Sequence, residues 1–194
     1  MRLFIALDID GPIRERITRF VDGVHNFSPD ARWVKPESLH VTLKFIGEQP
    51  DDALEKVKQA LTDITAATSE IKFYGYGFFP TLKSARVFWI GMESGPQLAQ
   101  MAAAIDERIA HLGIKKEDRA FSPHLTLARA AGGSGSPRWR KGDGPNAFSY
   151  LQEKLSALPV PEFGTMTPRD FFLYQSQLSP KGSKYTKLAK FPLG

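Results

Sequence analysis

The sequence predicts an α+β fold in which two largely antiparallel sheets carry helices on their outer sides and enclose a central cleft. Strand and helix patterns alternate irregularly, and several predicted strands are neighbours in sequence, which favours antiparallel sheets over a doubly wound parallel sheet. The third observation is a repeat, because the pattern Ser-x-His-x-Thr-Leu occurs at residues 38–43 and again at 122–127. Each copy follows an amphipathic helix and a loop. We therefore expect a single domain over residues 1–194, duplicated about a pseudo-two-fold axis into two intertwined lobes with one copy each.

The first half of the chain alternates strand and helix patterns. Residues 2–8 predict a buried strand, and Pro12 opens an amphipathic helix. Residues 26–38 predict a loop, and the first motif follows as a strand over 38–45. A second helix begins around Pro50. The apolar stripes of these helices are Ile13, Ile17, Phe20, Val21 and Val24, and Leu54, Val57, Leu61 and Ile64.

The second half predicts two paired strands, two further helices and three final strands. Residues 71–79 and 85–92 predict strands joined by a basic turn, and Gly75 and Gly77 indicate a bulge or a close backbone approach. The later elements are a helix with Leu98, Met101, Ile105, Ile109 and Leu112 on its apolar face, the second motif as a strand, a Gly-rich loop at 131–145, a helix with Phe148, Leu151, Leu155 and Leu158, and strands near 160–166, 170–177 and 184–191.

Composition is ordinary for a globular protein, and the charge is compatible with anionic partners. The 194 residues carry a formal net charge of +5 and a pI near 9.4. The absence of cysteine excludes disulfides, thiolate nucleophiles and Cys-ligated zinc. No apolar run approaches the ~18 residues of a membrane span, and Asp8 and Asp10 interrupt the apolar N-terminus, so it is not a signal peptide. We expect a cytoplasmic protein with no membrane association and no obligate protein partner.

Alternation along the two motif strands separates polar from apolar side chains, because residues i and i+2 of a strand share a face. We expect His40, Thr42 and Lys44 on one face of the first strand, and His124 and Thr126 on one face of the second. Packing of the opposite faces into the lobes would leave two imidazoles and two hydroxyls directed into a shared cleft. The residues on those opposite faces are Leu39, Val41, Leu43 and Phe45, and Leu125 and Leu127.

Two histidines that face one substrate form an acid–base couple. Their unperturbed pKa lies near ~6.5, so one imidazole can be neutral while the other is protonated at neutral pH. This suits phosphoryl transfer on an RNA ribose, where one imidazole deprotonates the attacking water or hydroxyl and the other protonates the departing ribose oxygen. The threonine hydroxyls can donate to the non-bridging phosphate oxygens. The scheme requires no metal and no other cofactor.

Alternative explanations account for parts of the pattern. A single His-x-Thr on a strand is more often an exposed polar face than a catalytic site, but the second copy favours a shared functional site. Zinc would need a third protein ligand, and neither motif has an Asp or Glu on its polar face. Ser38 and Ser122 could be nucleophiles, but their place two residues before each histidine favours local hydrogen bonding at the strand entry. His25 and His111 lie near helix ends and are expected to be surface or capping residues.

The paired motifs resemble those of the 2H phosphoesterases, and within them those of the RNA 2′,3′-cyclic phosphodiesterases, historically named 2′-5′ RNA ligases. The similarity runs nearly from end to end and is carried by "MRLFIALD", "RWVKPESLHVTLKFIGE", "FSPHLTLAR" and "LYQSQLSPKGSKYTKLAKFPL". It implies a bilobed, pseudo-symmetric α+β fold with two antiparallel sheets around a water-filled cleft. It also implies hydrolysis of RNA 2′,3′-cyclic phosphate ends to 2′-phosphomonoesters, together with a slow, reversible joining of RNA ends through a 2′-5′ bond.

The resemblance also implies roles for the four motif residues. By this likeness, His40 is the proton donor to the leaving oxygen and His124 is the proton acceptor that activates water. Thr42 and Thr126 would hold the phosphate. The partners implied are RNA ends or nucleotides that carry a 2′,3′-cyclic phosphate.

Further residues are candidates for substrate binding. Arg129 ends the second motif and could reach the phosphate, but strict alternation places it on the face opposite His124, so it can help only if the strand ends or bends there. Trp33 and Phe121 could stack on bases. The other candidates lie in stretches that resemble the family and are Tyr174, Ser176 and Tyr185.

Two other functions stay open at this point. One is hydrolysis of a small nucleotide such as ADP-ribose 1″,2″-cyclic phosphate, and the other is a non-catalytic RNA-binding module, against which the two intact motifs argue.

The loop "SGSPRWRKGDG" generates a prediction of its own, because Arg138, Arg140 and Lys141 surround Trp139 about ten residues after the second motif. Neutralising the three cations is expected to weaken the use of an RNA oligonucleotide and its salt dependence, while a cyclic mononucleotide is barely affected. The measurement is kcat/KM for both substrates at low and moderate salt. Equal effects on both substrates would leave the loop as a solubilising segment.

Overall fold

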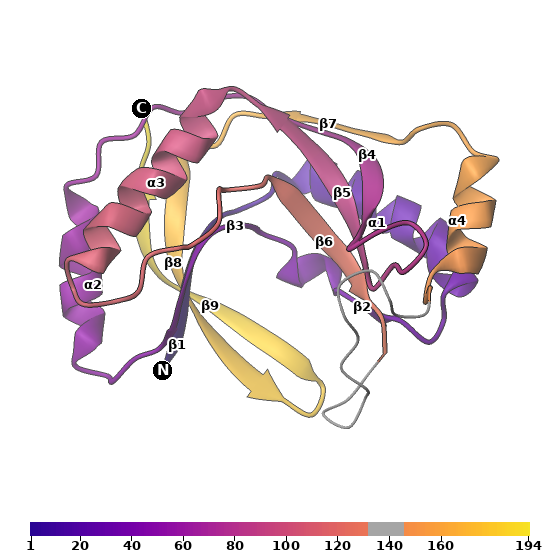
Figure 1. The fold of residues 1–194 in the computed structure, drawn as a ribbon. Helices are drawn as coiled ribbons and strands as arrows, with labels where there is room; N and C mark the ends of the chain where they lie inside the picture. Colours follow the sequence, from indigo (N-terminus) through magenta and orange to yellow (C-terminus); the bar gives the residue numbers. More distant parts are fainter. Residues whose placement is uncertain (132–145) are drawn as a thin grey trace.

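The computed structural model describes residues 1–131 and 146–194, which form two antiparallel sheets with helices at their outer sides (Figure 1). The basic segment from Arg138 to Lys141 lies outside the described residues. The first sheet has the strand order β3 (Val41–Glu48), β1 (Arg2–Leu7), β8 (Asp170–Ser179) and β9 (Gly182–Pro192). The second has the order β2 (Arg32–Trp33), β6 (His124–Arg129), β5 (Val87–Ser94), β4 (Ile71–Phe79) and β7 (Glu162–Met166). The predicted α+β class with antiparallel sheets is confirmed.

The helices exchange sides between the two sheets. Helix α1 (Gly11–Val24) follows β1 of the first sheet but packs against β7 of the second. Helix α3 (Pro96–Ala110) follows β5 of the second sheet but packs against β3 of the first and against α2 (Ala53–Thr62). Helix α4 (Ser149–Ser156) lies at the far end of the second sheet (Figure 1). Two single-turn 3₁₀ helices, η1 (His25–Phe27) and η2 (Pro36–Ser38), complete the described elements. None of the helices in the described ranges is long and apolar enough to cross a membrane.

Each sheet has one face covered by helices and one free of them, which we call the motif face. On the second sheet, Phe88 points to the covered face and contacts Phe20 of α1 and Phe148 beside α4. Figure 1 shows α2 and α3 at one outer side, α4 at the other and the strands of both sheets between them. The two motif faces are therefore directed inwards, between the helical layers.

An extra residue after the threonine of each motif shifts the register of both motif strands. In β3, Ala6 lies opposite Thr42 while Ile5 lies opposite Lys44, so Leu43 has no partner of its own. Such a bulge reverses which side chains face the core, because strand alternation has a period of two.

The bulge in β3 corrects two predicted side-chain directions. Lys44 was expected beside His40 and Thr42, but it faces the core and is buried. Phe45 was expected in the core, but it lies on the motif face near Phe4 and is 66% exposed. The prediction from strict alternation was wrong for these two side chains because the bulge interrupts the regular strand.

The bulge in β6 stands at the equivalent position. Trp89 of β5 lies opposite Thr126 while Phe88 lies opposite Ala128, so Leu127 is the extra residue. Ala128 is consequently buried in the core, and Arg129 turns to the motif face with Thr126. The expectation from alternation that Arg129 faces away from His124 is thereby corrected.

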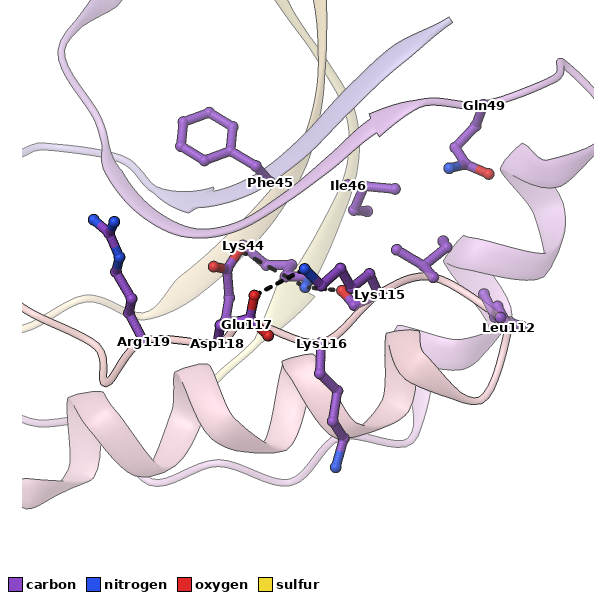
Figure 2. Close-up of a pocket in the computed structure, with 12 residues that line it drawn as sticks. Lys44, Phe45, Ile46, Gln49, Leu112, Lys115, Lys116, Glu117, Asp118 and Arg119 are labelled. Atoms are coloured by element: carbon purple, nitrogen blue, oxygen red, sulfur yellow. Dashed lines mark hydrogen bonds and ion pairs between the residues drawn. The ribbon is translucent and has the colours of Figure 1, made fainter.

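In Figure 2, the buried ammonium of Lys44 is directed at the segment that carries Lys115 and Glu117. Its Nζ lies 2.6 Å from Oδ1 of Asp106 and donates to the carbonyl of Lys115 at 2.7 Å. A hollow of about 690 Å³ opens beside this ion pair and is lined by the 112–119 segment and by Phe45. Neither motif histidine lines it, so we assign the ion pair to the attachment of α3 and its following loop to β3.

The ion pair of Lys44 generates a stability prediction. Lys44→Ala leaves the Asp106 carboxylate without its partner in a site largely removed from water, and we expect a loss of about 3–5 kcal/mol in the free energy of unfolding. Urea unfolding measures this loss. The double variant Lys44→Met/Asp106→Asn, which removes both charges, should recover part of it.

The control for this prediction is Lys58→Ala, which removes an exposed cation paired with Glu55 and should change the free energy of unfolding by less than about 1 kcal/mol. A Lys44→Ala protein with the urea midpoint of the original protein would show that the buried pair does not support the fold.

Candidate active site

Both motif histidines are fixed by the same hydrogen bond. Nδ1 of His40 lies 2.8 Å from the carbonyl oxygen of Ser38, and Nδ1 of His124 lies 2.9 Å from that of Ser122. A carbonyl oxygen only accepts, so Nδ1 of each ring carries the proton and donates it. In the neutral ring this leaves the Nε2 lone pair free for a substrate. The serine two residues before each histidine thus acts through its backbone at the strand entry.

The surroundings of the two histidines differ. The His40 ring lies among three aromatic rings on the motif face of the first sheet. Its centroid is 4.6 Å from that of Tyr174, 5.2 Å from that of Tyr185 and 5.8 Å from that of Phe4. His124 is exposed, with Trp89 as its ring neighbour at 6.0 Å. The same motif therefore places one imidazole in an apolar setting and the other in water.

The enclosure of His40 changes its acidity. Burial lowers the pKa of His40 from 6.5 to about 4, because the imidazolium loses its hydration. The hydrogen bond to Ser38 and the carboxylate of Asp8 oppose this shift by raising the pKa. The cations of Arg14 and Lys187 reinforce it. His40 is consequently neutral at pH 7 in the free protein.

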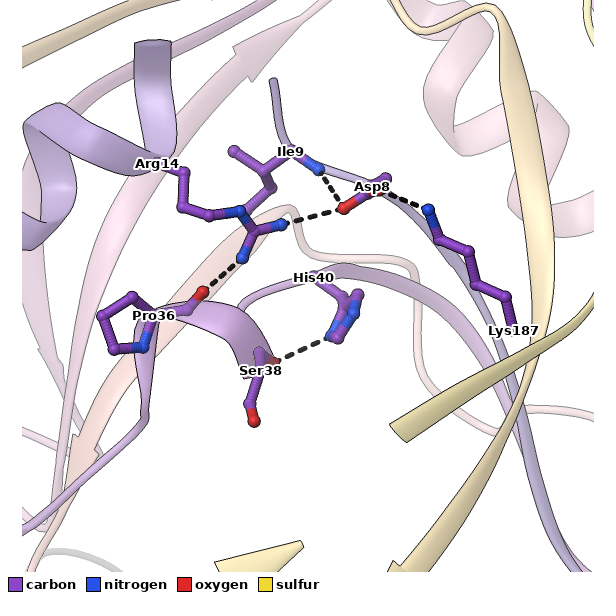
Figure 3. Close-up of polar contacts among 7 residues, drawn as sticks. All are labelled: Asp8, Ile9, Arg14, Pro36, Ser38, His40 and Lys187. Carbon is purple, nitrogen blue, oxygen red and sulfur yellow. Dashed lines mark hydrogen bonds and ion pairs between the residues drawn. The ribbon is translucent and has the colours of Figure 1, made fainter. Parts of the chain in front are cut away.

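Asp8 links the end of β1 to β9 and to α1, as Figure 3 shows. Its Oδ1 accepts from the backbone N–H of Ile9 at 2.9 Å and from Nη2 of Arg14 at 2.8 Å, and its Oδ2 accepts from Nζ of Lys187 at 2.7 Å. Burial raises the pKa of Asp8, but the bond and charge of Lys187, with the contributions of Ile9 and Arg14, lower it overall. Arg14 also donates to the carbonyl of Pro36, which holds η2 and therefore the approach to His40.

The other motif residues lie beside the histidines on the two motif faces. Thr42 follows His40 on the first sheet, and Thr126 and Arg129 follow His124 on the second. Thr42 and Thr126 are partly exposed, and Arg129 is exposed. Hydroxyl and guanidinium donors therefore accompany the two imidazoles.

The predicted substrate-binding residues of β8 and β9 have different exposures. Tyr185 and Ser176 are opposite neighbours on the motif face and are partly exposed. Tyr174 stacks on Phe4 with ring centroids 5.0 Å apart and is only 2% exposed, and its hydroxyl has no hydrogen-bond partner among the described residues. The structure gathers these three side chains on the His40 side.

Trp33 and Phe121 are not brought to the motif faces. The Trp33 indole packs edge-on against Phe88, with ring centroids 5.9 Å apart, and its Nε1–H donates to the carbonyl of Ser28 at 3.0 Å. Phe121 is partly buried and packs against the main core. Both rings support the fold in this structure, and their placement does not favour the predicted stacking on bases.

Trp89 was missed by sequence reasoning and lies beside His124. Its indole covers Gly77 of β4 so closely that a Cβ there would come within 2.1 Å of the ring. The close backbone approach predicted at Gly77 is thus confirmed, as is a bulge at Gly75, where the β4–β5 register shifts and φ is +71°. A glycine facing an aromatic residue across a hairpin is the signal that could have found Trp89.

Among the described residues, no group of three or more His, Asp or Glu side chains is arranged to hold a metal ion. The polar groups at the motif faces include two imidazoles, two threonine hydroxyls, the guanidinium of Arg129 and the Lys187–Asp8 pair. This set provides proton transfer and anion binding, which are the requirements of phosphate ester chemistry.

Comparison with known proteins gives one family. A model described as "LigT like Phosphoesterase" matches residues 7–89 and again residues 90–185, so that each match contains one motif. The RNA 2′,3′-cyclic phosphodiesterase of Archaeoglobus fulgidus is 35% identical over 191 residues, which cover 98% of this chain and 99% of the relative. That of Escherichia coli K12 is 30% identical over 201 residues, covering 99% and 96%. The solved structure of E. coli LigT complexed with 3′-AMP has a TM-score of 0.76 at 26% identity, covering 99% of this chain and 97% of that one.

The low pKa of His40 generates a prediction for stability. In the unfolded chain the His40 imidazole titrates near pH 6.5. Between pH 6.5 and 4 it is therefore protonated in the unfolded state but neutral in the folded state. Stability should therefore fall as the pH decreases through this window. Urea unfolding at pH 7 and pH 4.5 measures the change, and His40→Gln should reduce it.

The same titration can be followed directly by NMR. The C2 proton of His40 should keep the chemical shift of the neutral ring at pH 6.5 and below, and the midpoint of its titration should lie at about pH 4. A His40 signal that titrates near pH 6.5 would contradict the effect of burial.

Proposed function

The chain belongs to the LigT-like phosphoesterase family, and on this premise we propose that it hydrolyses the 2′,3′-cyclic phosphate at RNA ends to a 2′-phosphomonoester, with His40 and His124 as an acid–base pair. The observation that carries the proposal is the shared Nδ1 anchor, which presents Nε2 of both rings on the inward motif faces. Full-length relatives that are named RNA 2′,3′-cyclic phosphodiesterases support the reaction class. The chain is accordingly a phosphodiesterase of the hydrolase class.

The reaction exchanges one bond to phosphorus for another. Nε2 of His124 accepts a proton from water, whose oxygen attacks the cyclic phosphorus. The bond from phosphorus to the ribose 3′ oxygen breaks, and Nε2–H of His40 protonates that oxygen as it leaves. The product keeps the phosphate on the 2′ oxygen. Each turnover moves one proton from His124 to solvent and one from solvent to His40, which restores the pair.

The proton on His40 depends on the substrate in this scheme. Burial keeps the free imidazole neutral at pH 7, with a pKa of about 4. A cyclic phosphate bound beside Thr42 brings a negative charge to the motif face, and an opposite charge within a few ångströms favours the imidazolium. His40 therefore becomes an acid when the substrate that needs the acid is present.

The phosphate is held by neutral and charged donors together. Thr42 and Thr126 donate to its non-bridging oxygens from opposite sheets, and Arg129 supplies a cation on the His124 side. Tyr185 and Ser176 border the substrate on the His40 side. These donors are fixed before the reaction, so they stabilise charge that develops on the phosphate oxygens.

The same steps with another nucleophile would join RNA ends. A ribose 5′ hydroxyl in place of water attacks the cyclic phosphate and forms a 2′-5′ bond, with the same proton transfers. Hydrolysis dominates because water is far more concentrated than RNA ends. The solved complex of E. coli LigT with 3′-AMP supports binding of a nucleotide by this chain.

Substitution of either histidine tests the mechanism. His40→Ala and His124→Ala should each lower the turnover of an RNA 2′,3′-cyclic phosphate by about 10²–10⁴-fold, and the double variant should be little worse, because the two rings act as a unit. The assay is run in excess EDTA, which should leave the original protein active. Near-normal turnover by His40→Ala, or loss of activity in EDTA, would contradict the metal-independent pair.

A change of leaving group distinguishes the acid from the base. In a nucleoside 2′-phosphodiester with p-nitrophenolate as leaving group, the leaving oxygen departs as a stable anion and needs little protonation by an acid. On this substrate His40→Ala should lose much less activity than on the cyclic phosphate, whereas His124→Ala should lose activity on both. The opposite result would exchange the two roles.

A further inference from the structure

Two arginines lie directly opposite each other on the motif face of the second sheet. In the pairing of β2 with β6, Arg32 is the partner of Arg129, and both side chains are exposed. In the described part of the chain, neither guanidinium has an ion pair or a hydrogen bond. Like charges on opposite residues of neighbouring strands are destabilising. An unbalanced pair of this kind is typical of a site whose counter-charge comes from a ligand.

The backbone around Arg32 is held by the contacts of the next two residues, and this fixes the direction of the Arg32 side chain. Strand β2 has two residues, and the second, Trp33, is anchored in the core by Phe88 and by the carbonyl of Ser28. The next residue, Val34, donates its N–H to the carbonyl of Leu127 at 2.8 Å. Because neighbouring residues of a strand point to opposite faces, burial of Trp33 turns Arg32 to the motif face.

The arginine pair lies in line with the reaction site. Along β6, His124, Thr126 and Arg129 share one face, and Thr126 and Arg129 are two pairing steps apart, which is roughly 7 Å. This separation is comparable to that of consecutive phosphates in an extended RNA strand. A phosphate held at Thr126 would therefore have its upstream neighbour near Arg129 and Arg32.

Resting on the proposed function, we propose that Arg32, beside Arg129, forms a second phosphate site that binds the phosphate on the 5′ oxygen of the terminal nucleoside, with Arg129 lying between this phosphate and the cyclic phosphate at Thr126. The preferred substrate is then an RNA end with an upstream phosphodiester, rather than an isolated nucleoside cyclic phosphate. Guanidinium groups suit this role because they stay charged and donate two parallel hydrogen bonds to phosphate oxygens. The phosphate in turn removes the repulsion between the two arginines.

The test compares two substrates that differ by a single group. These are adenosine 2′,3′-cyclic phosphate with and without a 5′-phosphate, and the measurement is kcat/KM at low and moderate salt. The original protein should prefer the 5′-phosphorylated substrate, and Arg32→Gln should lower that preference about tenfold. The dependence of log kcat/KM on log salt for the 5′-phosphorylated substrate should become shallower, because one contact between opposite charges is lost.

Two further variants make the result specific. Arg19→Gln removes one exposed cation from the outer side of α1, where Arg19 pairs with Glu15, and should leave the preference unchanged. Arg32→Lys keeps the charge and should retain the salt dependence, but it should lose part of the preference because an ammonium cannot donate the two parallel hydrogen bonds. If Arg32→Lys loses the salt dependence as Arg32→Gln does, the second phosphate site is wrong.

The outcomes separate this inference from the proposed function. If the original protein opens neither cyclic phosphate, the proposed function is wrong. If it opens both and Arg32→Gln keeps the preference and the salt dependence, only the second phosphate site is wrong. Folding of Arg32→Gln is checked by urea unfolding, and removal of a like charge should leave its stability equal to that of the original protein or higher.

Discussion

The candidate site depends on one irregularity that occurs in both motif strands, an unpaired leucine directly after the motif threonine. Leu43 in β3 and Leu127 in β6 each add one residue against the neighbouring strand. Up to the threonine, polar side chains face inwards, and beyond the bulge the alternation is reversed. Without the two bulges, Phe45 and Arg129 would be buried among helices, and Lys44 would stand beside His40. The position of the bulge relative to the motif is the same in both halves, which is strong evidence that the halves arose by duplication of one unit.

Duplication made the histidines alike in geometry, and the surrounding sheets made them different in environment. Nδ1 of each ring donates a hydrogen bond to a backbone carbonyl, which fixes the orientation of the ring before substrate binds. Binding therefore costs little side-chain conformational entropy. His40 lies among Phe4, Tyr174 and Tyr185, whereas His124 is open to water beside Trp89. A symmetric pair of imidazoles would have no preferred direction of proton transfer. In the proposed mechanism, an enclosed ring that gains its proton beside the substrate phosphate and an open ring that exchanges protons with water would set one direction of proton transfer.

Sequence reasoning located what local patterns encode and missed what register and packing decide. The α+β class, the helices and the motif strands follow from periodicity, because a helix stripe or a strand alternation is visible within a few residues. The sequence left open whether Arg129 shares a face with His124, because "HLTLAR" has no glycine or proline that would indicate the bulge. Trp33 drew attention as the large aromatic of its segment, yet burial of that ring is what exposes the neighbouring Arg32. Asp8 was noted only for interrupting an apolar stretch, because its partners Arg14 and Lys187 are brought to it by the fold.

One motif face suits the base and ribose of a nucleotide, and the other suits its phosphates. The first sheet presents rings, with Phe45 exposed near Phe4 and Tyr185 near His40. The cation of Lys187 on this sheet is paired with Asp8. The second sheet presents Arg32 and Arg129 without counter-charges among the described residues. Apolar rings favour a base or a ribose, and unpaired guanidinium groups favour phosphates. Under the proposed function, a terminal nucleotide with its cyclic phosphate between the two threonines would have its upstream backbone on the second sheet. The RNA chain would then pass the exposed His124, and the terminal nucleoside would lie on the side of the enclosed His40.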